Sequence, residues 1–282
     1  MKILVIGADG FIGRNICTSL GEIHDIYKVC RRSLPDGDEK VFAADLADFA
    51  EVTRMLGSLS FSRLRIDLVI HCAARLASGE SSRNMDIFLE NNRITESVVR
   101  IAGKLDVARV INFSTIGVYP NSDGIYSETS AVNTTLNAEC LYSLSKFCSE
   151  QVFEFFIGEG KVVNLRLAQT FGPGMRDDRI YALFLKELQE NNTITVWGNG
   201  ERVSNFISIS KLVEIIQHIV GDIRIAGVYN TGEKNISYGQ LAEMLIDEFG
   251  NSESRIIKIE KGTRAKVVID CSKLNNSIKN GE

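Results

Sequence analysis

Short apolar runs recur along the first 170 residues and alternate with segments whose apolar residues have helical spacing. The runs are Lys2–Ile6, Ile26–Cys30, Val41–Ala43, Asp67–His71, Arg109–Phe113 and Lys161–Arg166. Their apolar residues are nearly continuous, as in strands that are buried on both faces. Strands that alternate with helices predict a parallel sheet built by right-handed crossovers. We therefore expect an α/β fold around a parallel sheet.

The pattern changes near residue 170, where shorter mixed elements are joined by stretches rich in Asn, Gly and Asp. We expect residues 1–170 to form one domain and residues 171–282 to form a smaller α/β domain. Residues 205–230 have a strand–helix–strand pattern, and we expect them to return to the first domain.

Residues 84–102 and 141–156 each carry an apolar stripe at helical spacing, and we expect both stripes to cover the sheet. The stripes consist of Ile87, Asn91, Ile94, Val98 and Ile101 in the first helix, and of Leu141, Leu144, Cys148, Val152 and Phe155 in the second. Each helix also has a smaller second stripe, formed by Phe88 and Val99 in the first and by Phe147 and Phe156 in the second. These second stripes favour a contact between two copies of the chain, so we expect a homodimer.

The composition is that of a globular protein with a sizeable core. Hydrophobic residues make up 44% and charged residues 24% of the 282 residues. The net charge of −4 argues against a nucleic-acid-binding protein, which needs an excess of basic surface. The six cysteines and three histidines form no cluster with metal-ligand spacing, so we expect no metal and a reducing compartment. No apolar run is long enough for a signal peptide or a membrane span, and we expect a cytoplasmic protein without a membrane partner.

Three glycines follow the first apolar run, in the sequence Gly7-Ala8-Asp9-Gly10-Phe11-Ile12-Gly13. The first glycine permits a tight turn, the second lets the backbone approach a pyrophosphate, and the third lets the next helix pack close to the strand. The N-terminus of that helix offers free N–H groups to the phosphates. A plain glycine turn is the alternative, but the position between a strand and an amphipathic helix favours a dinucleotide site.

The second apolar run ends in Cys30-Arg31-Arg32. A site that prefers NAD usually has an acidic residue here to bind the ribose 2′-hydroxyl, whereas an arginine accommodates the 2′-phosphate of NADP. Arg31 and Arg32 can pair with a phosphate, so we expect NADP(H), with NAD(H) as the alternative. A solvated basic turn would explain the same residues without any ligand.

Tyr142 and Lys146 are four residues apart on the second predicted helix, which places the phenol and the ammonium on one helical face. A nearby ammonium and an oxidised nicotinamide would stabilise the phenolate, so that it could exchange protons with a sugar hydroxyl. Thr115 follows the fifth apolar run by two residues, at the sheet edge where ligands bind, and could donate to a carbonyl oxygen. The alternatives are an exposed pair on a helix flank and ordinary capping by a threonine.

Together these motifs resemble the extended short-chain dehydrogenase/reductase family, in particular its nucleotide-sugar epimerases, dehydratases and reductases. The resemblance extends over nearly the whole chain. It rests on Gly7–Gly13, Asp45-Leu46, His71-Cys72-Ala73-Ala74, Ser114-Thr115 ahead of Val118-Tyr119, Tyr142 with Lys146, Arg166–Pro173, Val196–Gly200, Asn205-Phe206-Ile207 and Gly227–Asn230. The family implies a Rossmann-type doubly wound sheet with a smaller C-terminal α/β domain that binds a nucleotide-diphosphate sugar.

The resemblance also implies roles for the residues around the cofactor. Tyr142 would be the acid/base, and Lys146 would lower the pKa of that phenol and bind the ribose. Asp45 and Leu46 would flank the adenine. Ala73 and Ala74 would lie along the pyrophosphate side.

On the substrate side, the resemblance places Thr115 at the reacting oxygen and Gln169 at the phosphates, where relatives often have Asn. Trp197 would line the pocket of the nucleotide base. Arg202, Arg176 and Arg179 are candidate phosphate partners, although solvated loop charges would explain the last two equally well.

Three departures from the family pattern narrow the reaction. Dehydratases of the family usually have an acidic residue beside the active hydroxyl, whereas Ile116 and Gly117 follow Thr115 here. Reductases that also epimerise at C3 and C5 have a Cys at the position of Gly117 and a later His, and residues 174–185 contain no His. The arginine that relatives carry just before the Asp/Asn-Phe pair is Ser204 in this chain.

The reaction that remains is hydride transfer at one sugar carbon. We expect NADPH-dependent reduction of the 4-keto group of a nucleotide-activated 4-keto-6-deoxy sugar, in the biosynthesis of deoxysugars or surface polysaccharides. The first alternative is a nucleotide-sugar 4-epimerase with tightly bound NAD. The second is a dinucleotide-binding regulatory or scaffold protein without turnover.

Overall fold

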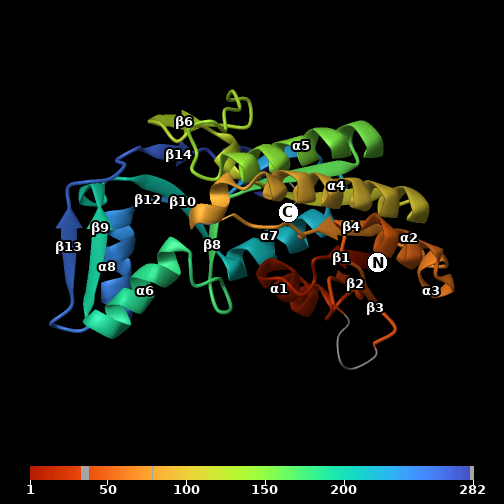
Figure 1. Cartoon of the computed structure of the whole chain (residues 1–282), viewed down its shortest axis with the longest axis horizontal. Helices are drawn as coiled ribbons and strands as arrows, with labels where there is room; N and C mark the ends of the chain where they lie inside the picture. Colours follow the sequence, from red (N-terminus) through yellow and green to blue (C-terminus); the bar gives the residue numbers. More distant parts are fainter. Residues whose placement is uncertain (33–37, 78, 280–282) are drawn as a thin grey trace.

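The structure, a computed structural model, describes residues 1–32, 38–77 and 79–279. Its largest sheet has seven strands in the order β11-β7-β5-β4-β1-β2-β3 (Figure 1). The strands are β1 Lys2–Ile6, β2 Asp25–Cys30, β3 Val41–Ala43, β4 Leu68–His71, β5 Arg109–Thr115, β7 Val162–Leu167 and β11 Gly227–Thr231. All neighbouring pairs are parallel, which confirms the predicted parallel sheet.

Helices cover both faces of this sheet, as the doubly wound fold requires. Alternate residues of β1 point to opposite faces, so that Ile3 and Val5 join one hydrophobic core while Leu4 and Ile6 join the other. Figure 1 shows α4 and α5 on one side of the sheet and α1 and α7 on the other. The bounds are α1 Phe11–Leu20, α2 Phe49–Gly57, α3 Leu59–Ser62, α4 Met85–Leu105, α5 Cys140–Ile157 and α7 Ile209–Gly221.

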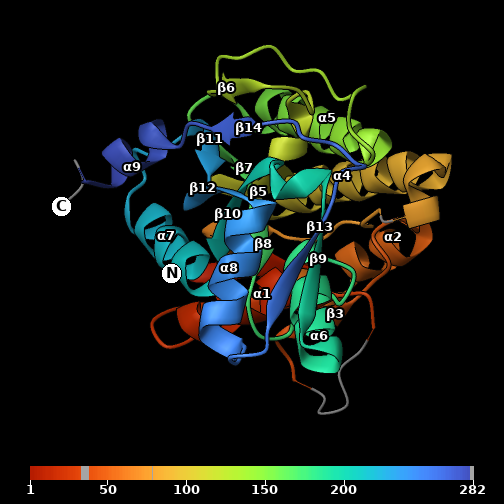
Figure 2. The ribbon, with the colours of Figure 1, turned by 90° about the vertical axis from the view of Figure 1, so that its left-hand side faces the viewer.

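The rest of the chain forms smaller sheets around a core of its own (Figure 2). A three-stranded sheet has the order β12-β10-β8, and two strand pairs, β13 with β9 and β14 with β6, lie beside it. The elements are β6 Gly124–Tyr126, β8 Gln169–Phe171, β9 Thr193–Trp197, β10 Val203–Ser208, β12 Lys234–Ser237, β13 Arg255–Ile259, β14 Val267–Ile269, α6 Ile180–Asn191, α8 Tyr238–Phe249 and α9 Ser272–Lys279, with the 3₁₀ helices η1 Gly79–Arg83, η2 Ile116–Val118 and η3 Gly198–Gly200.

Residues 205–230 are shared between the two parts of the molecule. Strand β10 belongs to the three-stranded sheet, whereas α7 packs on the large sheet and β11 forms its edge. Helix α9 also contacts the large sheet, because Leu274 is buried in the same core as α7 (Figure 2). The division into domains 1–170 and 171–282 stays a prediction.

The apolar stripe predicted for the first long helix is confirmed, because in α4 four of its five residues are buried and Ile94 is half-buried. The corresponding prediction for α5 is wrong. Its predicted stripe is only half-buried, and Phe155 at its end is 80% exposed. The buried residues of α5 are instead mostly polar: Ser143, Ser145, Lys146, Ser149, Glu150 and Phe153. Polar side chains of the neighbouring strands form hydrogen bonds with this face, as described below.

Candidate functional site

The glycine-rich loop is folded tightly onto the ends of two strands. Gly7 has a φ of +80°, a left-handed conformation that glycine adopts without strain, and its N–H donates to the Val29 carbonyl of β2 at 2.9 Å. A Cβ at Gly7 would lie 2.7 Å from the Ala73 nitrogen, and a Cβ at Gly13 would lie 2.2 Å from the Gly7 carbonyl oxygen. Both positions therefore exclude a side chain, as the close packing of strand, loop and helix requires.

Helix α1 begins without a side-chain cap. Its N-cap residue is the exposed Gly10, whereas α2 and α4 are capped by the side chains of Asp48 and Asn84. Phe11 and Ile12 pack partly against the core, so the first turn is fixed while its backbone end stays accessible. Free N–H groups at an accessible helix N-terminus suit an anion such as a pyrophosphate.

The predicted adenine-side residues differ in exposure. The Asp45 carboxylate accepts from the Ala47 N–H at 2.9 Å and thereby shapes the turn into α2. Leu46 is buried, and its carbonyl accepts from the Ser97 hydroxyl at 2.7 Å. Arg31 and Arg32 are exposed just beyond β2. The preference for NADP that we predicted from these two arginines stays a prediction.

The segment that carries Ala73 and Ala74 is held in place by Asn91, a buried residue of α4. The Asn91 Oδ1 accepts from the Arg75 N–H at 2.8 Å, and its Nδ2 donates to the Arg75 carbonyl at 3.0 Å and to the Ser145 hydroxyl at 3.1 Å. One amide thus joins the segment after β4, helix α4 and helix α5. From the sequence, we placed Asn91 in an apolar stripe and predicted no role for it. A single polar residue within that stripe was the feature that could have indicated one.

Lys146 is 4% exposed. Among the described residues, no side chain or carbonyl group accepts a hydrogen bond from its ammonium. Burial lowers the pKa of Lys146 to about 8, against the opposing effects of Cys72 and Glu150. An ammonium that the protein leaves without an acceptor suits a ligand with hydroxyl or phosphate oxygens.

Tyr142 is half-buried one turn before Lys146 on α5. Burial raises the pKa of its phenol to about 12, with a further upward effect of Glu139 and downward effects of Arg179 and Arg176. We had expected Lys146 to lower the pKa of this phenol. The charged groups that act on the phenol in the structure are instead Glu139, Arg179 and Arg176. A phenol with a raised pKa stays protonated at neutral pH, so it holds a proton to donate, although the raised pKa also makes it a weaker acid.

Thr115 lies at the carboxyl end of β5, and α5 packs against the short helix η2 that follows it. Its Oγ1 accepts from the Gly117 N–H at 3.0 Å, which leaves the hydroxyl hydrogen available to a ligand. A Cβ at Gly117 would lie 2.5 Å from the Ser143 Oγ and 3.3 Å from the Thr115 Oγ1. The Ser143 hydroxyl therefore occupies the space that a side chain at position 117 would need.

The predicted substrate residues Gln169 and Arg202 meet at Tyr238, the first residue of α8. The Gln169 Nε2 donates to the Ser204 hydroxyl at 2.9 Å and to the Tyr238 hydroxyl at 3.4 Å. The Arg202 guanidinium lies 5.1 Å from the centre of the Tyr238 ring. Sequence reasoning missed Tyr238, because nothing in its neighbourhood along the chain indicates that it contacts β8 and β10.

Arg176 and Arg179 lie on the same side as Tyr142, because both act on the pKa of its phenol. Arg179 donates to the Glu139 carboxylate at 3.0 Å, and the Arg176 Nε donates to Asp178 at 2.9 Å. Two cations therefore lie near the candidate proton donor, already paired with carboxylates. Trp197 ends β9 and is 56% exposed, and no described contact joins it to this group.

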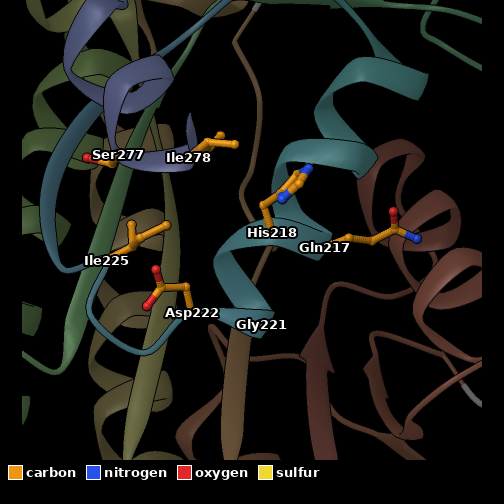
Figure 3. Close-up of a pocket in the computed structure, with 7 residues that line it drawn as sticks. All are labelled: Gln217, His218, Gly221, Asp222, Ile225, Ser277 and Ile278. Carbon is orange, nitrogen blue, oxygen red and sulfur yellow. The ribbon is translucent and has the colours of Figure 1, made fainter. Parts of the chain in front are cut away.

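A cavity of about 320 Å³ lies elsewhere, between α7 and α9 (Figure 3). It is lined by Gln217, His218, Gly221, Asp222, Ile225, Ser277 and Ile278, none of which the sequence analysis predicted as a site residue. Residue Ile225 precedes the start of β11, so this cavity lies at the amino edge of the parallel sheet. The candidate site lies at the carboxyl edge, where ligands of such sheets bind.

The residues present fit a dinucleotide. Gly7 and Gly13 exclude side chains, α1 has no side-chain cap at its N-terminus, and the Lys146 ammonium donates to no described residue. Within residues 1–32, 38–77 and 79–279, no three His, Cys, Asp or Glu side chains gather as a metal-ligand set. Among the helices of the same residues, none is long and apolar enough to cross a membrane.

Comparisons with known proteins show which proteins the chain is similar to. The GDP-6-deoxy-D-talose 4-dehydrogenase of Aggregatibacter actinomycetemcomitans is 26% identical over 228 residues, which cover 79% of this chain and 71% of that protein. The dTDP-4-dehydro-6-deoxyglucose reductase of Escherichia coli is 28% identical over 229 residues, which cover 75% of this chain and 70% of that protein.

Solved structures show the same fold. The UDP-N-acetylglucosamine 4-epimerase from Bacillus cereus has a TM-score of 0.80 at 18% identity, over 99% of this chain and 92% of that chain. The model of the "NAD dependent epimerase/dehydratase family" matches residues 3–232. Since that match covers most of the chain, the protein belongs to this family of NAD-dependent oxidoreductases, epimerases and dehydratases, within the extended short-chain dehydrogenases/reductases.

Proposed function

We propose that the protein reduces the 4-keto group of a nucleotide-diphosphate 4-keto-6-deoxy sugar with NADPH. The observation that carries the proposal is the absence of space beside the reacting hydroxyl. Ile116 and Gly117 follow Thr115, and a side chain at position 117 would collide with the Ser143 hydroxyl. An acid or base for dehydration or for a second epimerisation would need that space. The remaining hydroxyl, phenol and ammonium suffice for one reduction.

The proposed roles follow from the free hydrogens of these groups. The Thr115 Oγ1 already accepts from the Gly117 N–H, so its hydrogen donates to the 4-keto oxygen and polarises the carbonyl. Tyr142 then donates its proton to the oxygen, which becomes a hydroxyl. Its raised pKa keeps the phenol protonated at neutral pH. Lys146 binds the cofactor ribose. When bound, NADPH supplies the hydride to C4.

The predicted substrate contacts complete the proposal. Gln169 and Arg202, together with Tyr238, would bind the sugar-nucleotide phosphates at the end of the three-stranded sheet. Arg31 and Arg32 would bind the 2′-phosphate of NADPH. The names of two relatives support the choice of carbon, because one is a 4-dehydrogenase of a 6-deoxy sugar nucleotide and the other a reductase of a 4-dehydro-6-deoxy sugar nucleotide.

The test follows NADPH or NADH absorbance with dTDP- and GDP-linked 4-keto-6-deoxy sugars, after the nucleotide retained on the purified protein has been identified. Tyr142→Phe should reduce kcat by about 10²–10⁴-fold and leave NADPH affinity nearly unchanged. Tyr27→Phe, in the half-buried part of β2, is the matched control and should keep the wild-type rate.

Other outcomes would overturn the proposal. Retained NAD with interconversion of C4 epimers and no net oxidation of NADPH would identify the 4-epimerase instead. A protein that binds the cofactor but turns over no sugar nucleotide would be a regulatory or scaffold protein. A Tyr142→Phe variant with full activity would remove that residue from the mechanism.

A further inference from the structure

Helix α5 is attached to helix α4 and to the large sheet by hydrogen bonds along its buried face. The Asn91 amide of α4 donates to Ser145 at 3.1 Å, and the Asn112 amide of β5 donates to Ser149 at 3.1 Å. The Ser114 hydroxyl of β5 donates to the Glu150 carboxylate. Each of these bonds requires a specific rotation of the helix about its axis, which apolar packing alone would not impose.

Glu150 has the largest share of these contacts and is 0% exposed. Its carboxylate accepts from the Arg166 Nε at 3.1 Å and from its Nη2 at 2.9 Å. Arg166 lies on β7 and donates from Nη1 to the Tyr119 hydroxyl at 2.9 Å, which in turn donates to Asn230 of β11 at 2.7 Å. This network, from Ser114 through Glu150 and Arg166 to Asn230, joins α5 to three neighbouring strands.

Two residues of this network lie beside the proposed catalytic residues. Ser114 is the residue before Thr115 on β5, and Glu150 lies one helical turn after Lys146 on α5. A displacement of the Glu150 carboxylate would therefore change the position of Thr115 relative to Lys146. Buried ion pairs contribute little net stability compared with apolar residues of similar volume, so stability alone is a weak explanation for this pair.

We propose that Glu150 is a positioning residue of the proposed reduction, which holds Lys146 and Tyr142 on α5 in register with Thr115 on β5 and provides the counter-charge of the Lys146 ammonium. This inference rests on the proposed function for the roles of Thr115, Tyr142 and Lys146. It adds a residue that touches neither cofactor nor substrate and acts only through its neighbours.

The charges around Lys146 make the proposal testable by pH. The ionisable groups that act on it are Glu150 on α5, and His71 and Cys72 at the end of β4. His71 is buried and its pKa lies well below its usual range, and burial raises the pKa of the Cys72 thiol, so both are neutral near pH 7. Glu150 is then the negative charge that favours the ammonium, and its removal should lower the pKa of Lys146.

The experiment compares Glu150→Gln, which keeps the shape and removes the charge, with wild type. In wild type, NADPH affinity should fall as the pH rises through about 8, where Lys146 loses its proton. In Glu150→Gln, this fall should begin about one pH unit lower, and kcat for the sugar nucleotide should decrease roughly ten- to a hundredfold. Ser149→Ala, on the same buried face, changes no charge and should keep the wild-type pH dependence of NADPH binding.

A second variant covers the case in which Glu150→Gln does not fold, and a binding measurement separates this test from the test of the proposed function. If Glu150→Gln fails to fold because Arg166 is left unpaired, the double variant Glu150→Gln/Arg166→Met removes both charges and should show a smaller shift of NADPH binding in the same direction, because loss of the Arg166 charge opposes loss of the carboxylate. An unshifted pH dependence in a folded variant would reduce Glu150 to a structural residue and overturn the inference. Because NADPH binding is measured without turnover, wild-type protein that reduces no 4-keto sugar would refute the proposed function and leave the test of Glu150 intact.

Discussion

The Lys146 side chain is buried, and its ammonium has lost most of the water that would solvate the charge. Its pKa of about 8 means that burial disfavours the charged form, although Glu150 partly offsets this effect. Below pH 8 the folded and unfolded states both hold the proton, so the folded state bears the full cost. Between about pH 8 and the ordinary lysine pKa near 10.5 the unfolded state binds more protons, and stability rises with pH. Above that range the cost disappears.

Lys146→Met should therefore stabilise the protein while it abolishes turnover. At pH 7 the free energy of unfolding should increase by up to about 3 kcal/mol, since one pKa unit corresponds to about 1.4 kcal/mol. The difference from wild type should shrink between pH 8 and 10, as urea unfolding at several pH values will measure. Lys186→Met, at an exposed position of α6, is the control without a pH-dependent difference. A Lys146→Met variant that is less stable at pH 7 would contradict the argument.

At this scale, sequence reasoning identified the residues that belong to short motifs. Tyr142 and Lys146 are four residues apart, and the three glycines lie within seven residues, so their relation is visible along the chain. We did not predict the contacts of Asn91, Glu150 and Tyr238, because their partners are distant in sequence. Hydrogen bonds across 16 to 69 residues depend on the fold and leave no local pattern.

The two long helices show why periodicity predicts one element well and another poorly. Helix α4 packs mainly on apolar neighbours, so its apolar stripe marks its buried face. Helix α5 packs on Asn112, Ser114 and Arg166, so its buried face is polar and its apolar stripe points partly outward. The prediction of a buried face from an apolar stripe assumes that the helix packs on apolar residues. That assumption fails where a functional site with polar residues lies between a helix and a sheet.

The approach of α1 to β1 gives a prediction for this pair of elements. Gly13→Ala places a methyl group 2.2 Å from the Gly7 carbonyl oxygen, so α1 must move away from the loop. We expect a loss of about 1–3 kcal/mol in the free energy of unfolding and a marked loss of NADPH affinity. Gly103→Ala, where nothing lies within 4 Å of the added carbon, should instead stabilise α4 by about 0.5–1 kcal/mol.

Urea unfolding and a fluorescence titration with NADPH will measure both variants. Equal effects of the two substitutions would show that the clash at Gly13 is relieved without moving the helix. A Gly13→Ala variant that loses stability but keeps NADPH affinity would detach the glycine-rich loop from the proposed cofactor site.

For the whole molecule, the parallel sheet was predictable because buried strands are continuous apolar runs. Six of its seven strands lie within or close to the runs read from the sequence. The arrangement after residue 170 was harder to predict, since β10 and β11 are neighbours in sequence but belong to different sheets. Short strands with polar edges carry too little pattern to indicate their partners.

The outer surface of α5 bears on the proposed homodimer. Phe155 is 80% and Phe156 63% exposed at the end of this helix, and their rings contact each other with centres 5.1 Å apart. Phe147 and Val99, which we had assigned to the dimer stripe, pack partly against cores of the same chain. Phe88 is half-buried, so Phe156 is the exposed residue of the stripes that we had assigned to the dimer. Phe155, which we had expected to cover the sheet, forms an exposed phenylalanine pair with it.

Phe155→Glu/Phe156→Glu should convert a dimer into a monomer, because two carboxylates in an apolar contact would have to be buried without partners. Sedimentation velocity over a wide concentration range measures the change, and circular dichroism checks the fold. Phe249→Glu, an exposed phenylalanine of α8, is the matched control and should leave the dimer intact. A wild-type protein that sediments as a monomer, or a double variant that remains dimeric, would exclude this surface as the interface.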